Sequence, residues 1–283
     1  MSTALFKSIH TRDTLRLAWP LVITQVGHII TGMVDNIFLG HIGPAEQAAG
    51  ILSNNLYMIV LVFVMGMSYA VTPLTTEAFE KNDVFKKAAL LKNSLFLNLT
   101  VAVGCFVLLY NISGLMHQMR QPAEVVTLAI PFFDVLIFSM VPLALFFTCK
   151  QYCEGLSNTR MALYVSVVGN LLNVLLNYLL IYGHWGCPEL GYIGSAWASF
   201  YARLFMGFVF LWLVFRSPVT REVTKVFGTV KVNLKSLAAL WKIGFNSALQ
   251  FTFEVAAFAI AGFMAGSFGK EQIDAHGIAL SIA

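Results

Sequence analysis

The chain has 283 residues, of which 58% are hydrophobic and only 11% are charged, and its formal net charge is +4. A soluble domain has about 25% charged residues, because its surface must be solvated by water. The composition therefore excludes a water-soluble enzyme, a nucleic-acid-binding protein and a disordered segment. It indicates an all-α polytopic membrane protein, with the lipid bilayer as its surroundings.

Seven stretches are long and apolar enough to cross the bilayer as helices, which takes roughly 20 residues. In chain order we predict spans at residues 16–40, 51–74, 90–113, 127–149, 161–182, 192–215 and 241–266. An eighth span begins near Ala275. The first span is too long for a signal peptide and lacks an A-x-A cleavage pattern, so we expect it to stay as a membrane helix.

Lys and Arg residues are distributed unequally between the two sides of the membrane. With alternating connections, fifteen of the 18 fall on one side, Arg120 and Lys270 fall on the other, and Arg203 lies within the sixth span. Positive charges concentrate on the cytoplasmic side of membrane proteins. We therefore expect a cytoplasmic N terminus, and we attribute the basic composition to topology.

Residues 216–240 form the one long polar connection, which ends in a short amphipathic run from Val232 to Trp241. Such a segment is typical of a linker along the inner membrane interface. We predict an N-terminal lobe of six helices at 1–215, a cytoplasmic linker at 216–240, and the start of a second lobe at 241–283.

A short repeat relates the first span to the seventh. Gly40 and Gly43 follow the first span, and Gly266 and Gly269 stand at the same offset after the seventh. A duplicated six-helix unit would place the motif in this way. Doubling the unit gives about 450 residues and twelve helices. We therefore expect the chain to be a fragment of a longer protein.

Asp35 lies within the first span, where an ionisable side chain costs about 2.5 to 3.5 kcal/mol near the bilayer centre. Thr31, His28 and Gln25 fall near the same helical face. Asp35 reaching the outer interface is one interpretation. The polar stripe favours a second, a site for a proton or a cation.

Three amides follow helical spacing in the fifth span, namely Asn170, Asn173 and Asn177. Amide carbonyls are hard oxygen ligands that suit a small cation, but Asn residues also join membrane helices by hydrogen bonds. The stripe alone does not separate these two interpretations. Asp35 supplies the missing negative charge, which favours a role for these amides as cation ligands.

Glu254 lies near the middle of the seventh span, with Gln250 one turn before it and Phe251 on its flank. A neutral glutamic acid bonded to a neighbouring helix is one explanation. We favour a carboxylate that binds a cationic substrate or exchanges it for a proton, with Gln250 and Phe251 as further substrate contacts.

Pro20 and Pro142 each remove one backbone hydrogen bond from a predicted span, the first and the fourth, and so permit kinks. The sequence has no H-E-x-x-H, G-x-S-x-G, P-loop or dinucleotide-binding motif, and its His and Cys residues are scattered. We therefore expect neither enzyme activity nor a resident cofactor.

Several segments, taken in order, resemble the MATE (multidrug and toxic compound extrusion) transporters of the NorM-like branch. They are Trp19 to Leu21, Asp35 with Gly40 and Gly43, Glu154 with Gly155, Gly169 to Gly183, and Gly191 to Ala198. Asn177 stands where a DinF-like branch would have an Asp, which favours the NorM-like assignment. The family's further acid on a later helix is absent from this sequence.

The resemblance implies a twelve-helix antiporter of the bacterial inner membrane, with two six-helix lobes around a V-shaped cavity. It implies export of organic cations or drugs in exchange for Na⁺ or H⁺, by a monomer. Asp35, Asn173 and Asn177 would match the cation site of the N-terminal lobe, Pro20 the bending point of the first helix, and Glu254 the carboxylate of the seventh.

Two other functions remain open. A lipid-linked precursor flippase of related architecture would need a cationic cavity, and the excess of acids over bases expected at the membrane centre disfavours it. A polytopic membrane enzyme would need reactive groups clustered at one membrane face, and the scattered His and Cys residues disfavour it.

Overall fold

The structure is a computed structural model that describes residues 2–118 and 121–267, with side chains except those of 2–17, 28, 115 and 258–267. The predicted eighth span near Ala275, the second glycine step at Gly269, and the outer-side residues Arg120 and Lys270 lie outside the described residues. The described elements are all helical: α1 (Ser2–Ile42), α2 (Pro44–Tyr69), α3 (Val71–Glu80), α4 (Val84–Ile112), η1 (Ser113–Gln118), α5 (Ala123–Phe138), α6 (Met140–Gly155), α7 (Thr159–Tyr182), η2 (His184–Gly186), α8 (Ile193–Arg216), η3 (Pro218–Thr220), α9 (Arg221–Phe227) and α10 (Leu234–Ser267).

Among the described residues, five helices are long and apolar enough to cross a membrane, and the bent pair α5 and α6 makes a sixth. The five are Ala18–Ile42, Pro44–Glu80, Val84–Ile112, Thr159–Tyr182 and Ile193–Arg216. These six segments coincide with the first six predicted spans. The seventh predicted span lies within α10, whose side chains the structure describes only as far as Ala257 and which is not in this count.

Several helices begin before the predicted spans, because a first-turn proline or a polar capping side chain starts them ahead of their apolar stretch. Pro44 occupies the first turn of α2, where its missing N–H costs nothing. The Asp83 side chain accepts a hydrogen bond from Lys86 N at 2.9 Å and caps α4. Asn233 Oδ1 accepts from Lys235 N at 2.9 Å, so α10 begins near residue 234 rather than at 241.

The fourth predicted span is bent by 41° between α5 and α6. Pro142 has no N–H to donate to the carbonyl of Phe138, so the backbone ladder is interrupted beside the bend. Ser139 lies at the break, and its hydroxyl donates to the Leu136 carbonyl at 2.5 Å. The kink expected at Pro142 is therefore present, and it turns the Ser139 hydroxyl into the protein interior, where the residue is fully buried.

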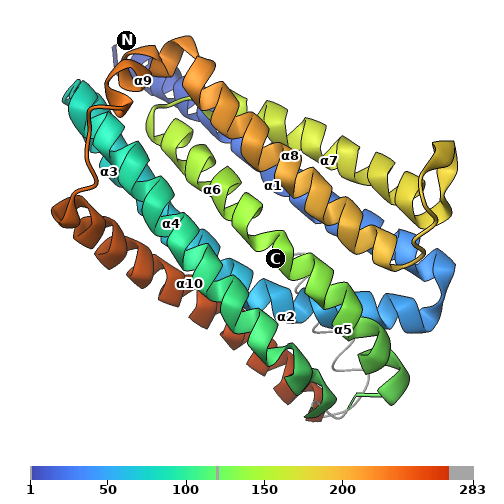
Figure 1. Ribbon diagram of the computed structural model, residues 1–283. Coiled ribbons are helices and arrows are strands. Elements are labelled where there is room, and N and C mark those ends of the chain that lie inside the picture. The colour runs from blue at the N-terminus through green and yellow to red at the C-terminus, as the bar shows by residue number, and fades with distance from the viewer. Residues whose placement is uncertain (1, 119–120, 268–283) are drawn as a thin grey trace.

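The spanning helices form one bundle (Figure 1). Helices α7 and α8 lie side by side, α1 packs along α7, and α6 packs against both α8 and α4. On the other flank, α10 packs against α2 and α4. The largest fully buried side chains, which include Tyr57, Phe133, Tyr152 and Phe210, lie between these helices and form the core.

Small residues let α2 and α10 approach closely. A side chain at Gly66 would collide with the backbone of Ala248, and a Cβ at Gly244 would lie 2.7 Å from the carbonyl oxygen of Met67. Gly244 and Ala248 are one turn apart on α10, which is the small-xxx-small spacing of close helix pairs in membranes. The face of α10 that meets α2 is thereby fixed.

The turn between α9 and α10 is held by two neighbouring residues of α4. Lys92 Nζ donates to the carbonyl of Val230 at 2.6 Å and lies 5.4 Å from the centroid of the Phe227 ring. Asn93 Oδ1 accepts a hydrogen bond from Asn233 N at 2.9 Å. The predicted linker thus contains a short helix and a turn that is fastened to α4.

Candidate functional site

Asp35 lies where α1 meets α7 and α8, and both of its carboxylate oxygens accept a hydrogen bond. Asn177 Nδ2 of α7 donates to Oδ1 at 2.7 Å. The Ser199 hydroxyl of α8 donates to Oδ2 at 3.1 Å. Both donors are neutral, so the carboxylate is held in place without being neutralised by an ion pair.

A second layer of hydrogen bonds joins the same residues to Asn173. Asn177 Nδ2 also lies 3.2 Å from Asn173 Oδ1, and Asn173 Nδ2 donates to the Ser199 hydroxyl at 3.3 Å. Asn173 and Asn177 are 2% exposed and fully buried, respectively. Asn177 Oδ1 is buried and has no hydrogen-bond partner among the described residues. The cluster therefore has an amide oxygen available to a ligand.

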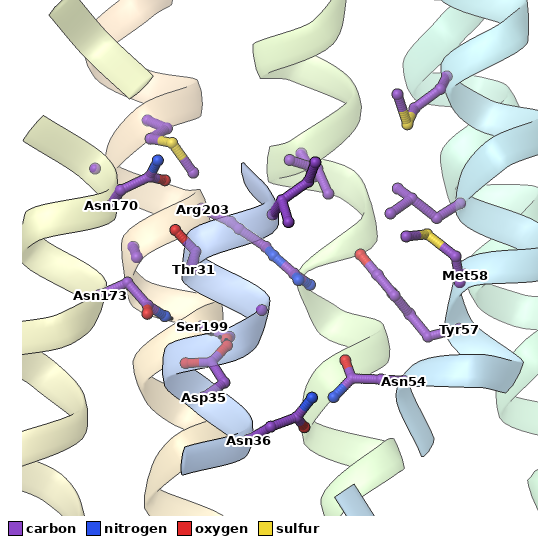
Figure 2. A pocket seen from close by; sticks show the side chains of 18 of the residues that line it. Thr31, Asp35, Asn36, Asn54, Tyr57, Met58, Asn170, Asn173, Ser199 and Arg203 are labelled. Atoms are coloured by element: carbon purple, nitrogen blue, oxygen red, sulfur yellow. Dashed lines mark hydrogen bonds between the residues drawn. The ribbon is translucent and has the colours of Figure 1, made fainter. Parts of the chain in front are cut away.

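Asp35 lines a cavity of about 360 Å³ enclosed by α1, α2, α6, α7 and α8 (Figure 2). Gln25 and Thr31 of the predicted polar stripe line the same cavity, as do Asn170 and Asn173. The side chain of His28 lies outside the description. Much of the remaining wall is apolar and comes from Ile29, Ile51, Met58, Leu61, Met65, Leu143, Phe147 and Met206.

Arg203 is the second charged residue of this cavity, and Figure 2 shows it reaching from α8 toward Tyr57 of α2. Its Nη1 donates to the Ser139 hydroxyl at 2.6 Å, and its guanidinium carbon lies 5.0 Å from the centroid of the Tyr57 ring. Tyr57 and Ser139 are themselves linked, with their hydroxyl oxygens 3.1 Å apart. Arg203 is thus oriented by α2 and by the bend between α5 and α6.

Helical spacing explains why these side chains meet. Asn173 and Asn177 are four residues apart on α7, and Ser199 and Arg203 are four apart on α8, so each pair shares one face. Gly169 lets α8 come close, because a side chain there would overlap Met206. The two polar faces consequently point at the same space.

The structure brings Asp35, Asn173 and Asn177 together, as the sequence analysis expected of the coupling-ion site. It places the predicted substrate residues elsewhere. Gln250 and Glu254 are exposed on α10, and neither they nor Phe251 lines the cavity around Asp35. Their roles remain predictions.

The placement of Glu254 follows from how α10 packs. Gly244 and Ala248 meet α2, and the Phe251 ring stacks on Tyr69 with centroids 5.0 Å apart. Glu254 is six residues after Ala248, about 120° around the helix from it, and it is exposed beside the face that meets α2. The expected excess of acids is therefore absent from this cavity, where one acid, Asp35, stands with one base, Arg203.

Pro20, the predicted hinge, lies inside α1, which continues through it. The Thr24 hydroxyl donates to the carbonyl of Pro20 at 2.8 Å. A bending role for Pro20 remains a prediction.

Sequence reasoning missed Ser199, Ser139 and Tyr57. A hydroxyl in a membrane helix gives little signal, because most bond to the carbonyl one turn earlier in their own helix, as Ser53 does to Ala49 and Thr31 does to Gly27. The one available clue was that Ser199 precedes Arg203 by a single helical turn.

The fold and the site define a polytopic membrane protein with a partly buried carboxylate in a cavity between its apolar helices. The family described as MatE matches residues 20–179, more than half of the chain. The chain therefore belongs to the MATE family of membrane transporters. This confirms the resemblance found in the sequence and agrees with the expectation that the chain is not an enzyme.

Curated relatives match along nearly the whole chain. The multidrug resistance protein MdtK of Yersinia pestis (strain Pestoides F) is 28% identical over 278 residues, which cover 97% of this chain and 60% of MdtK. The probable multidrug resistance protein NorM of Agrobacterium fabrum is 27% identical over 282 residues, covering 97% of this chain and 59% of NorM. The chain thus spans about 60% of the length of these relatives.

Solved structures show the same fold. A MATE protein in the bent conformation superposes with a TM-score of 0.81 at 19% identity, over 93% of this chain and 58% of that one. A multidrug resistance MATE family transporter in an outward-facing conformation superposes with a TM-score of 0.78 at 20% identity, over 90% and 55%. The expected fold class is therefore confirmed over the part of these transporters that the chain covers.

Proposed function

We propose that this protein is a cation-coupled antiporter that exports organic cations or drugs across the bacterial inner membrane. Cations enter a cavity in which Asp35 carries the negative charge, and coupling uses either Na⁺ or H⁺. Relatives named as multidrug resistance proteins support the substrate class.

The observation that carries this proposal is the environment of the Asp35 carboxylate. Ionisable groups within a membrane are costly, and they mark ion and substrate pathways when they face a cavity. Asp35 faces such a cavity, and its hydrogen-bond donors, Asn177 and Ser199, are neutral. A carboxylate in this setting is free to take up a positive charge and to release it again.

The donor atoms near Asp35 support Na⁺ as the first candidate for the coupling ion. Hard cations bind carboxylate, carbonyl and hydroxyl oxygens. Asn177, which donates to Asp35 through Nδ2, has a buried Oδ1 without a partner among the described residues. A proton would need only the carboxylate, so it leaves this amide oxygen unexplained.

The remaining wall suits an organic cation. Ile29, Met58, Met65 and Phe147 offer apolar and polarisable contacts around the charged end of the cavity. A flexible Met-rich surface accommodates ligands of different shape. Charge and apolar area are thus provided without a rigid, shape-specific pocket.

The proposed mechanism is alternating access. An ion bound at Asp35 drives the switch only by as much as it stabilises one conformation more than the other. Asp35 receives hydrogen bonds from both α7 and α8, so its charge state acts on the packing of α1 against that pair. A cationic substrate competes for the same negative charge.

Orientation and organisation are also part of the proposal. The N terminus and the linker at 216–240 lie on the cytoplasmic side, consistent with the concentration of Lys and Arg there. Residues 1–215 form the first lobe and 241–283 begin the second. The transporter acts as a monomer.

An efflux assay with the purified protein in vesicles tests this function. Ethidium loaded inside the vesicles is expected to leave when Na⁺ or H⁺ is supplied on the opposite side, and to remain when the gradient is collapsed by an ionophore. Export that is independent of both gradients, or absent, would contradict the antiporter.

Removing one oxygen donor tests the coupling ion. We expect Na⁺ to raise the thermal unfolding midpoint of the wild type more than K⁺ does, because a ligand that binds only the folded state stabilises it. In Asn177→Ala the Na⁺ concentration for half of this effect should rise by about tenfold, as for a loss near 1.4 kcal/mol. Asn173→Ala is expected to act in the same direction.

Asn111→Ala is the matched control, because Asn111 is an exposed residue of α4 whose amide bonds only to the carbonyl of Val107. Equal effects of Na⁺ and K⁺ on the wild type would show that Na⁺ does not bind and would leave the proton as the coupling ion.

A further inference from the structure

The cavity around Asp35 holds one charge of each sign. Arg203 lies one turn along α8 from Ser199, the residue that binds Asp35, yet the two charged groups do not form an ion pair. The ion pairs of the described residues involve Lys81, Lys86 and Lys150, and none includes Arg203. A permanent positive charge repels simple cations, so its presence in this cavity calls for a ligand group of the opposite sign.

Most of the bonding capacity of Arg203 is unused. A guanidinium has five N–H donors in a planar fork. One of them donates to Ser139, and no other hydrogen bond of this side chain occurs among the described residues. The Ser139 hydroxyl gives its own proton to the Leu136 carbonyl, so it is available to accept from Arg203. A fork with free donors lining a cavity is suited to a carboxylate, which it binds through two parallel bonds.

Different helices hold the two charges apart. Asn177 and Ser199 fix the carboxylate of Asp35, whereas Ser139 and the Tyr57 ring fix the guanidinium of Arg203. Opposite charges attract strongly in a weakly polar interior. Their separation is therefore maintained by these dedicated partners, and each charge stays available to a ligand.

We infer that Arg203 is a specificity-determining residue that binds the carboxylate of zwitterionic substrates while their cationic group lies toward Asp35. This inference rests on the proposed export function and adds the anionic half of substrate recognition to it. The ligand class is an amphipathic molecule with one amine or iminium cation, one carboxylate and an apolar body that contacts Met58, Leu61 and Met206.

The net charge of the ligand separates a binding role of Arg203 from a purely structural one. A zwitterion gains a partner from Arg203, but a monocation of the same shape is repelled by it. Replacing Arg203 by a neutral residue should therefore change the apparent affinities for the two ligands in opposite directions. A merely structural arginine would lower both.

Tetramethylrhodamine and its methyl ester provide this comparison, because the free acid is a zwitterion and the ester is a monocation with the same fluorophore. Transport of each dye is measured with the purified protein in vesicles under a fixed ion gradient and a clamped membrane potential. In Arg203→Gln the KM for the free acid should rise by about tenfold or more, as for the loss of a charged hydrogen-bonded partner. The KM for the methyl ester should stay the same or fall.

Two further variants complete the test. Arg203→Lys keeps the charge but not the fork, so it should restore part of the preference for the free acid. Arg216→Gln removes an exposed arginine from the end of the same helix and should leave both KM values as in the wild type. Should Arg203→Gln fold poorly, fluorescence polarisation of both dyes with folded Arg203→Lys tests the fork by itself: binding of the free acid should weaken and binding of the ester should stay the same, and equal binding of the free acid to wild type and variant would overturn the inference.

The outcomes are distinguishable. Equal changes for both dyes in Arg203→Gln, or no change for either, overturn the role of Arg203 and leave the antiporter intact. A wild type that exports neither dye nor ethidium under any gradient overturns the proposed function and this inference with it.

Discussion

Asp35→Asn is expected to reduce gradient-driven export to the level of protein-free vesicles. An asparagine is nearly the same size, and its carbonyl oxygen can still accept the hydrogen bond that Asn177 donates at 2.7 Å. What disappears is the negative charge. A neutral side chain neither attracts a cation nor exchanges a proton, so no differential binding remains to drive the conformational switch.

The measurement is ethidium efflux under imposed Na⁺ and pH gradients, together with the thermal unfolding midpoint of the variant. The midpoint should remain close to that of the wild type, because the amide keeps the size of the carboxyl group and can still accept from Asn177. Asp134→Asn is the matched control, since Asp134 is a partly buried acid of α5 that does not line the cavity. If Asp35→Asn still transports at the rate of the control, the coupling site lies elsewhere.

Gly207→Ala is expected to destabilise the fold by about 1 to 3 kcal/mol, the usual cost of overpacking. A Cβ at this position would lie 2.5 Å from the carbonyl oxygen of Pro142 and 3.3 Å from its carbonyl carbon. Both are backbone atoms next to the bend between α5 and α6, so no side chain can move aside. Helix α8 must shift away from α6 to admit the methyl group.

Thermal unfolding in detergent, followed by size exclusion, measures this effect. Gly104→Ala is the control, because Gly104 is an exposed glycine within α4 with no atom near its Cβ position. That change should be neutral or slightly stabilising, since alanine has a higher helix propensity than glycine. Equal midpoints for the two variants would show that α8 and α6 are not in close contact at Pro142.

Much of the fold was predictable because the bilayer leaves few alternatives. A span must bond its own backbone, so apolar length alone located the six segments from Ala18–Ile42 to Ile193–Arg216. The ends of the helices were harder to predict from the sequence. They depend on single capping residues such as Pro44 and Asn233, which carry no hydropathy signal.

The candidate site was predictable at the residue whose charge has a large free-energy cost inside the membrane. Asp35 stood out by the cost of its charge, helical spacing indicated a stripe of amides on α7, and the family resemblance narrowed that stripe to Asn173 and Asn177. The position of Arg203 was not predictable, because its partners Ser139 and Tyr57 come from helices far away in sequence. Only the packing of α8 against the bend of α5 and α6 brings them together.

Glu254 shows what the cost of a buried charge does not predict. Its cost in the membrane is as large as that of Asp35, and the sequence treats the two acids alike. The face that α10 turns toward α2 is decided by Gly66, Gly244 and Ala248, whose small size matters only once the helices meet. Burial cost identifies which residue matters, but it does not specify the space that the residue faces.

The fastening of the turn before α10 to Lys92 and Asn93 has a mechanical consequence. It makes the start of α10 a pivot that is anchored in α4. With 34 residues, α10 is a lever arm of about 50 Å. A rigid rotation of about 10° at Asn233 would carry the far end of this helix through about 9 Å, so a slight change at one end of the bundle would become a wide displacement at the other.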